Sequence, residues 1–143
     1  MDYLRSRPKG DFIDIGSLEE LYILTEHWQS ELLFYKDDLK FLRHLEDKYF
    51  TWTTAKDNLD NITRVGESIL KDTRDCNELL QRIKKHLAYL AEVIDNSEHQ
   101  EIKSFRSEHK ELEEDIVQFI ANTKNNRRQL FKVIEFDVNA DKF

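Results

Sequence analysis

Histidine and carboxylate residues four positions apart are the first feature of this sequence that could support chemistry. His109 and Glu113 form an HxxxE pair, and His27 and Glu31 repeat that spacing earlier in the chain. Residues four apart lie on one face of a helix, and imidazole and carboxylate groups are ligands for zinc or iron. Counting from the predicted turns places His86 at the height of His109. The candidate metal ligands are therefore His109, Glu113 and His86.

The metal pattern is not specific, however. Five histidines and 29 acidic residues are enough to produce HxxxE pairs by chance. Di-iron bundles use Glu-x-x-His motifs paired across helices, and this chain has no two such motifs. A histidine on an apolar stripe is more often a core residue satisfied by a hydrogen bond. We therefore expect no metal and no cofactor, with a small metal-binding bundle as the alternative.

The single cysteine does not suggest catalysis. Cys76 lies on an apolar stripe, where a thiol usually behaves as a small hydrophobic group. Arg74 and Arg82 are near it in sequence, but no histidine is placed to act as its base. The sequence also contains no glycine-rich phosphate loop and no GxSxG motif. We therefore expect a protein that is not an enzyme.

Charge and hydropathy exclude further classes of function. A net charge of −7 without a long basic stripe is a poor match to nucleic acid. No apolar segment is long enough to span a membrane, and the N-terminal residues lack the apolar region of a signal peptide. With one cysteine and no internal disulfide, these features predict a cytoplasmic protein. A basic cluster is interpreted as solvated charge at a helix C-terminus, with a patch for an acidic partner as the alternative; it comprises Lys124, Arg127, Arg128 and Lys132.

The elements that carry these residues are predicted to be long helices. The chain has only three glycines and one proline, and Gly66 is the only one of them after residue 16. Apolar residues recur at steps of three and four, which is the helical period. These features predict one all-α domain, an up-down-up antiparallel bundle of three long, coiled-coil-like helices.

The predicted helices span about residues 17–50, 54–95 and 98–133, within a bundle domain at 17–135. Ser17 and Glu20 form a capping box for the first helix, and Ser97 is the predicted cap of the third. The stripe of the second helix keeps its phase through Asp75, which favours one continuous helix. Flexible tails are expected at 1–16 and 136–143. An alternating, strand-like pattern around Phe136 is the alternative for the C-terminal tail.

The predicted core of each helix follows its apolar stripe. In the second helix the stripe comprises Leu59, Ile62, Gly66, Ile69, Thr73, Cys76, Leu80, Ile83, Leu87, Leu90 and Ile94. Polar residues such as Thr25, His109 and Asn126 interrupt the stripes. Polar core residues can define pairing at a cost in stability, so Asn126→Leu is expected to raise the melting temperature.

The first helix has more apolar surface than a bundle core uses. Nine of the fifteen residues at 21–35 are apolar or aromatic. After the core stripe is assigned, a second row is left over, comprising Ile23, Phe34, Phe41 and Leu45. Phe34 and Phe41 are seven residues apart and lie on one line, roughly opposite the core. A contiguous row of this kind predicts a partner surface.

Three kinds of segment are candidates to pack over this row. The favoured one is a second copy, packed helix one against helix one about a two-fold axis. The others are a helix of another protein and the protein's own N-terminal tail, through Phe12, Ile13 and Ile15. We therefore expect a non-enzymatic interaction or scaffold module that forms a homodimer through its first helix.

Overall fold

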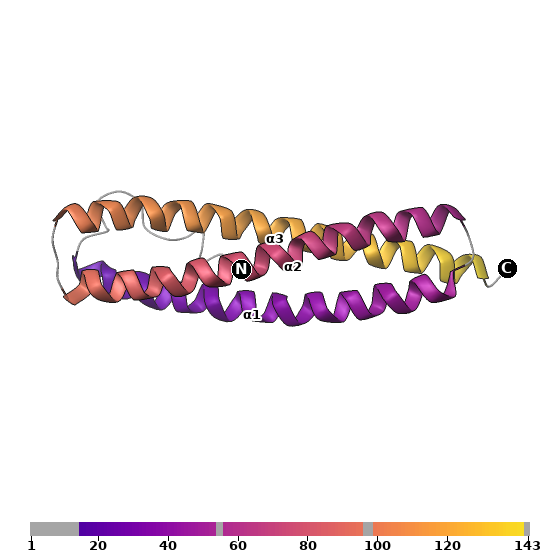
Figure 1. Ribbon diagram of the computed structural model, residues 1–143, viewed down its shortest axis with the longest axis horizontal. Coiled ribbons are helices and arrows are strands. Elements are labelled where there is room, and N and C mark those ends of the chain that lie inside the picture. Colours follow the sequence, from indigo (N-terminus) through magenta and orange to yellow (C-terminus); the bar gives the residue numbers. More distant parts are fainter. Residues whose placement is uncertain (1–14, 54–55, 96–98, 142–143) are drawn as a thin grey trace. The chain divides into compact units, whose positions relative to one another are not determined.

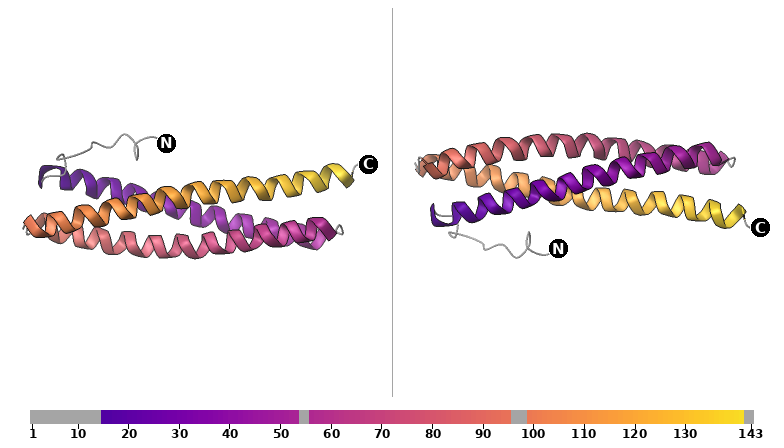
Figure 2. Two further views of the ribbon diagram at one scale, coloured as in Figure 1. Left: turned by 90° about the horizontal axis from the view of Figure 1, so that it is seen from above. Right: turned by 90° about the horizontal axis from the view of Figure 1, so that it is seen from below.

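The computed structural model describes the backbone of residues 15–53, 56–95 and 99–141, and the side chains of residues 18–53, 58–95 and 103–135. It contains three helices, α1 (Ile15–Trp52), α2 (Lys56–Asp95) and α3 (His99–Asp141). The helices alternate in direction, and α2 contacts both α1 and α3 (Figures 1 and 2). The predicted all-α, up-down-up bundle is confirmed.

The helix ends differ from the prediction in several places. α1 begins at Ile15, two residues before the predicted cap Ser17. α2 is continuous through Asp75, as its unbroken phase indicated. α3 continues to Asp141, so residues 136–141 are helical rather than a tail, because no glycine or proline stops the helix. Ser97, the predicted cap of α3, and the tail residues 1–14 lie outside the described residues.

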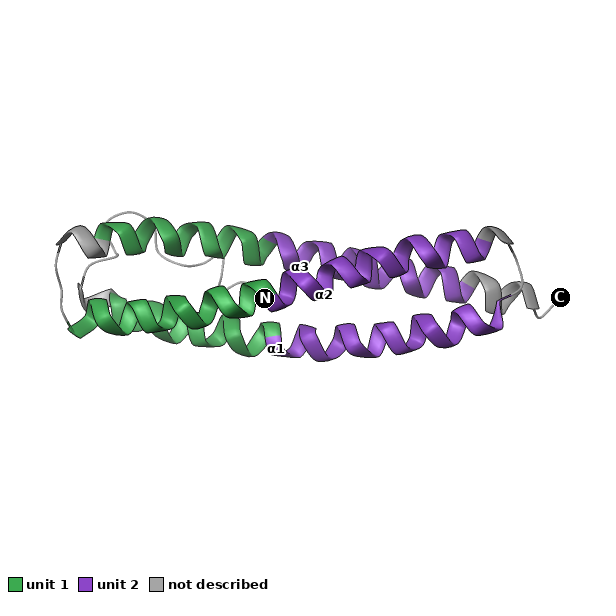
Figure 3. Cartoon of the chain, viewed as in Figure 1, with its two compact units in different colours: residues 1–32, 78–117 green, residues 33–77, 118–143 purple. Residues whose placement is uncertain are grey.

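The chain is organised in two compact units (Figure 3). Unit 1 comprises residues 1–32 and 78–117, and unit 2 comprises residues 33–77 and 118–143. Each helix contributes one segment to each unit and is unbroken where the units divide. Each unit therefore has a three-helix core of its own.

The core of unit 1 brings together side chains from all three helices. Leu18 and Leu21 of α1 pack with Leu90 and Val93 of α2 and with Phe105 of α3. Burying a side chain of this size contributes about 1.5–3 kcal/mol. Apolar burial therefore outweighs surface ion pairs, because a half-exposed pair contributes about 1 kcal/mol at most.

The core of unit 2 is built in the same way but accommodates a carboxylate. Leu39, Leu42 and Ile69 are fully buried there. Glu46 occupies a core position of α1 and lies over Gly66 of α2, where an added Cβ atom would collide with the carboxylate group. Gly66 therefore leaves the room that Glu46 occupies, which explains a glycine within a helix.

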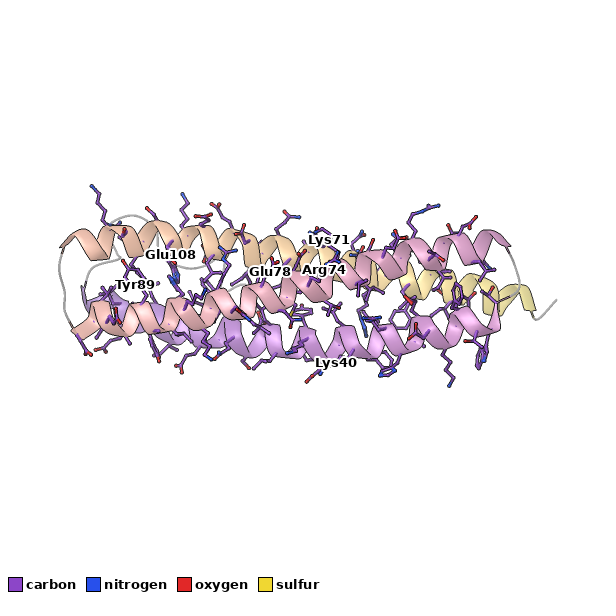
Figure 4. All side chains as sticks on the ribbon, viewed as in Figure 1. Lys40, Lys71, Arg74, Glu78, Tyr89 and Glu108 are labelled. Carbon is purple, nitrogen blue, oxygen red and sulfur yellow. The ribbon has the colours of Figure 1, made fainter. Side chains whose placement is uncertain are left out.

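Most of the described charged residues lie on the outer faces of the helices. Lys40, Lys71 and Glu108 are exposed, and their side chains extend away from the ribbon (Figure 4). Nζ of Lys71 lies 2.9 Å from Oδ2 of Asp75 one turn along α2, a solvent-exposed ion pair that adds little to stability. These residues make the surface hydrophilic without determining the fold.

The predicted stripes of α1 and α3 are confirmed for every position whose side chain is described, since each is buried or half-buried. In α2 the steps of three and four are also confirmed, but alternate positions are shifted by one residue. The residues that are buried at these positions are Asn58, Asp72, Leu79, His86 and Val93. The residues predicted there are only half-buried, namely Leu59, Thr73, Leu80, Leu87 and Ile94. The predicted residues of α2 therefore also lie on its buried side, but at these five positions the preceding residue is buried more completely.

This shift places a carboxylate inside unit 2. Asp72 is buried, and its Oδ2 accepts a hydrogen bond of 2.7 Å from Nδ2 of Asn126. Burial raises the pKa of Asp72, while hydrogen bonds from Asn126 and Thr123 oppose that rise. Asn126 is therefore the partner of a buried carboxylate rather than a polar interruption of an apolar stripe.

Asn126→Leu is accordingly expected to lower the free energy of unfolding by about 1–3 kcal/mol, because Asp72 would lose the hydrogen bond from Asn126 while remaining buried. This reverses the expectation from the sequence. Asn125→Leu, at the exposed neighbouring position, is the matched control and should change stability by less than about 0.5 kcal/mol. Urea denaturation followed by circular dichroism measures both variants. A more stable Asn126→Leu protein would contradict the role given to the hydrogen bond.

Candidate functional site

Two of the three candidate metal ligands meet inside unit 1. His86 of α2 and His109 of α3 are at most 1% exposed. Nε2 of His86 lies 3.0 Å from Nδ1 of His109, a hydrogen-bonding distance. The proximity of these two histidines, predicted from the positions of the turns, is therefore confirmed.

Aromatic rings enclose the histidine pair. The ring of Phe105 stacks on His86 with 4.5 Å between centroids, and Trp28 stacks on His109 at 4.8 Å. The ring of Tyr89 lies 6.0 Å from that of Phe105. Ring stacking on both histidines excludes water and gives the imidazoles an apolar environment.

This environment keeps His86 neutral. Burial lowers the pKa of His86 to about 4, and the positive charge of Arg82 lowers it further in the same direction. Nδ1 of His86 is buried and has no hydrogen-bond partner among the described residues. One of the two facing nitrogens, Nε2 of His86 or Nδ1 of His109, carries a proton and donates it to the other, so the neutral pair shares one hydrogen bond.

The third candidate ligand does not complete a metal site. Glu113 is half-buried one turn beyond His109 and makes interactions of its own within the protein. Over the described ranges, no three or more His, Cys, Asp or Glu residues form a group that could hold a metal ion. The geometry therefore supports a structural histidine pair.

The buried pair should make stability depend on pH. Unfolding restores an ordinary histidine pKa near 6.5, so between pH 6.5 and about 4 the unfolded chain binds a proton that folded His86 does not. Stability is therefore complete above pH 6.5 and falls as the pH drops toward 4, by about 3 kcal/mol in total. Denaturant titrations at several pH values, followed by tryptophan fluorescence, measure this loss.

His86→Gln is the informative variant, because it cannot titrate. Its stability should change less between pH 6.5 and 4.5 than that of the wild type. The matched control is His44→Gln, at an exposed position of α1, which should keep the wild-type slope. If the stability of the wild type and of the His86→Gln variant fell equally with pH, His86 would not be the source of the pH dependence.

The thiol of Cys76 is also buried in the protein. The residue is fully buried, and burial raises the pKa of the thiol to about 11. A thiol with this pKa holds almost no thiolate at neutral pH, and the thiolate is the nucleophile. The burial expected from the sequence is confirmed, and it argues against a reactive cysteine.

The basic cluster on α3 is not at a helix end. α3 continues to Asp141, so the helix dipole does not explain these cations. Arg127 Nη1 lies 3.2 Å from Oδ1 of Asp38 on α1, and the guanidinium group stacks over Phe131 at 5.0 Å. Arg127 therefore links α3 to α1 within unit 2.

The apolar row of α1 is largely in water. Ile23 in unit 1 is 66% exposed, and in unit 2 Phe34 and Phe41 are 64% and 53% exposed. Leu45 is half-buried at the margin of the row. The N-terminal tail considered as a cover, with Phe12 and Ile13, lies outside the described residues.

The sequence prediction missed one member of this row. Trp52 is 68% exposed and follows Phe34 by 18 residues, which is five full turns, so both lie on one line of α1. The signal was the continued spacing of Phe41, Leu45 and Trp52, but the predicted helix ended near residue 50. Nζ of Lys48 lies 5.6 Å from the centre of the Trp52 ring.

Comparisons with known proteins do not assign this chain to a family. No protein-family model, curated protein or solved structure matches this chain. Within the described ranges, no helix is both long enough and apolar enough to cross a membrane. Function must therefore be inferred from the chain's own residues.

Proposed function

We propose that this protein is a non-enzymatic helical interaction module that self-associates through the outer face of α1. The observation that carries the proposal is the exposure of Phe34, Phe41 and Trp52 on one line of that helix. Covering an aromatic side chain of this kind contributes about 1.5–3 kcal/mol. A row of three exposed rings is therefore a source of binding energy.

The other helices have no comparable row among their described side chains. Leu70 on α2 and Val117 and Phe131 on α3 are less than two-fifths exposed. Scattered apolar residues of this kind are ordinary on protein surfaces and require no partner. The concentration of exposed aromatic surface on α1 supports that helix as the site of association.

The interior of the protein supports a role without catalysis. The histidine pair is shielded by aromatic rings, and the thiol of Cys76 has a raised pKa. A general base must reach its substrate within hydrogen-bonding distance, and a nucleophilic thiol must ionise. Neither group meets its requirement, and the incomplete ligand set gives the metal-binding alternative no support.

Sedimentation equilibrium tests self-association. The wild type is expected to be a dimer, and Phe34→Glu with Phe41→Glu is expected to be a monomer, because charges would replace the apolar contacts. Leu70→Glu, at an exposed apolar position of α2, is the matched control and should remain dimeric. A monomeric wild type would rule out the proposal. A double variant that remains dimeric would place the interface elsewhere.

A further inference from the structure

The outer face of α1 in unit 2 carries a second seam with the spacing of a coiled coil. The seam comprises Phe34, Asp38, Phe41, Leu45, Lys48 and Trp52, at steps of four, three, four, three and four. At 100° per residue, all six lie within about 40° of the line through Phe34. Alternating steps of this kind are the pattern by which one helix packs along another.

The residues of the seam pair favourably with the same residues of a second copy that runs in the opposite direction. When a second copy of α1 lies antiparallel, centred near Arg43, Phe34 faces the second copy's Trp52. Phe41 then faces Leu45, and Asp38 faces Lys48. Every apolar residue of the seam meets an apolar residue, and each charge meets the opposite charge.

Other arrangements lose this complementarity. A parallel pair in register places Asp38 against Asp38 and Lys48 against Lys48, and like charges opposite one another are unfavourable. Sliding the antiparallel pair by one heptad places Asp38 against Phe41 in one direction and Lys48 against Leu45 in the other. Both shifts bury a charge against an apolar side chain. Charge complementarity therefore selects one direction and one register.

The side chains at both ends of the seam are already positioned. Lys48 lies over the Trp52 ring at 5.6 Å, so that cation and ring form one end. At the other end, the ring of Phe34 lies edge-on to that of Tyr35, and Nη1 of Arg127 lies 3.2 Å from Oδ1 of Asp38. A carboxylate has about four lone-pair sites, so Asp38 can accept a further hydrogen bond from a lysine.

We infer that α1 binds α1 of a second copy in antiparallel orientation, with the Lys48–Trp52 end of each copy on the Phe34–Asp38 end of the other. The inference rests on the proposed self-association and adds its direction and register. The occupant is a second copy rather than an unrelated helix, because the seam matches itself in both charge and apolar character.

Disulfide trapping tests the orientation. Two chains are prepared with Cys76→Ala, one carrying Phe34→Cys and the other Trp52→Cys, and one chain carries a tag that distinguishes mixed dimers by mass. In the inferred dimer, the introduced cysteines face each other between chains. Identical positions lie about 27 Å apart along the helix axis, whereas a disulfide requires Cα atoms within about 7 Å. The mixed dimer contains the Phe34–Trp52 contact twice. One is replaced by the two cysteines, and the other keeps both native residues.

Under mild oxidation, the expected result is a disulfide dimer in the mixture of the two chains and none in either chain alone. A Leu70→Cys chain mixed with the Trp52→Cys chain is the collision control and should not be trapped. A disulfide formed by the Phe34→Cys chain alone indicates a parallel pair and overturns the inference while preserving self-association. A dimeric wild type with no trapped product also overturns it, and a monomeric wild type in sedimentation overturns both proposals.

Discussion

The structure depends on the fact that each helix can bury only one stripe of side chains in a three-helix core. With no proline after residue 8 and Gly66 the only glycine after residue 16, the chain forms helices of 38, 40 and 43 residues. Side chains at steps of three and four face the other helices, and the remaining positions face water. Apolar residues in excess of one stripe therefore stay on the outside unless another molecule covers them.

The buried stripes are not purely apolar, and two buried polar residues of α2 pair with polar residues of α3. Asp72 and His86 are fourteen residues apart and occupy the same heptad position of α2. In unit 2 Asp72 pairs with Asn126 of α3, and in unit 1 His86 pairs with His109 of α3. Each unit therefore has a hydrogen bond between core positions of α2 and α3, which favours the register in which both partners are hydrogen-bonded.

The three helices differ in what they present to solvent. α2 and α3 expose mainly charged residues with scattered apolar ones, whereas α1 exposes a row of aromatic rings. An inner seam of α1 supports the bundle, and an outer seam is available to a partner. The same spacing rule thus serves folding on one side of the helix and, in the proposed dimer, association on the other.

The sequence alone determined the number and order of the helices, the stripes of α1 and α3, and the outward position of Ile23, Phe34 and Phe41. These follow from the spacing of apolar residues along one helix, which is local information. Only the tertiary structure decided which alternate positions of α2 turn inward and which buried polar groups pair. It also showed that α3 extends to Asp141. These outcomes depend on side chains from other helices or on helix ends without a distinctive residue, so the periodicity of a single segment does not encode them.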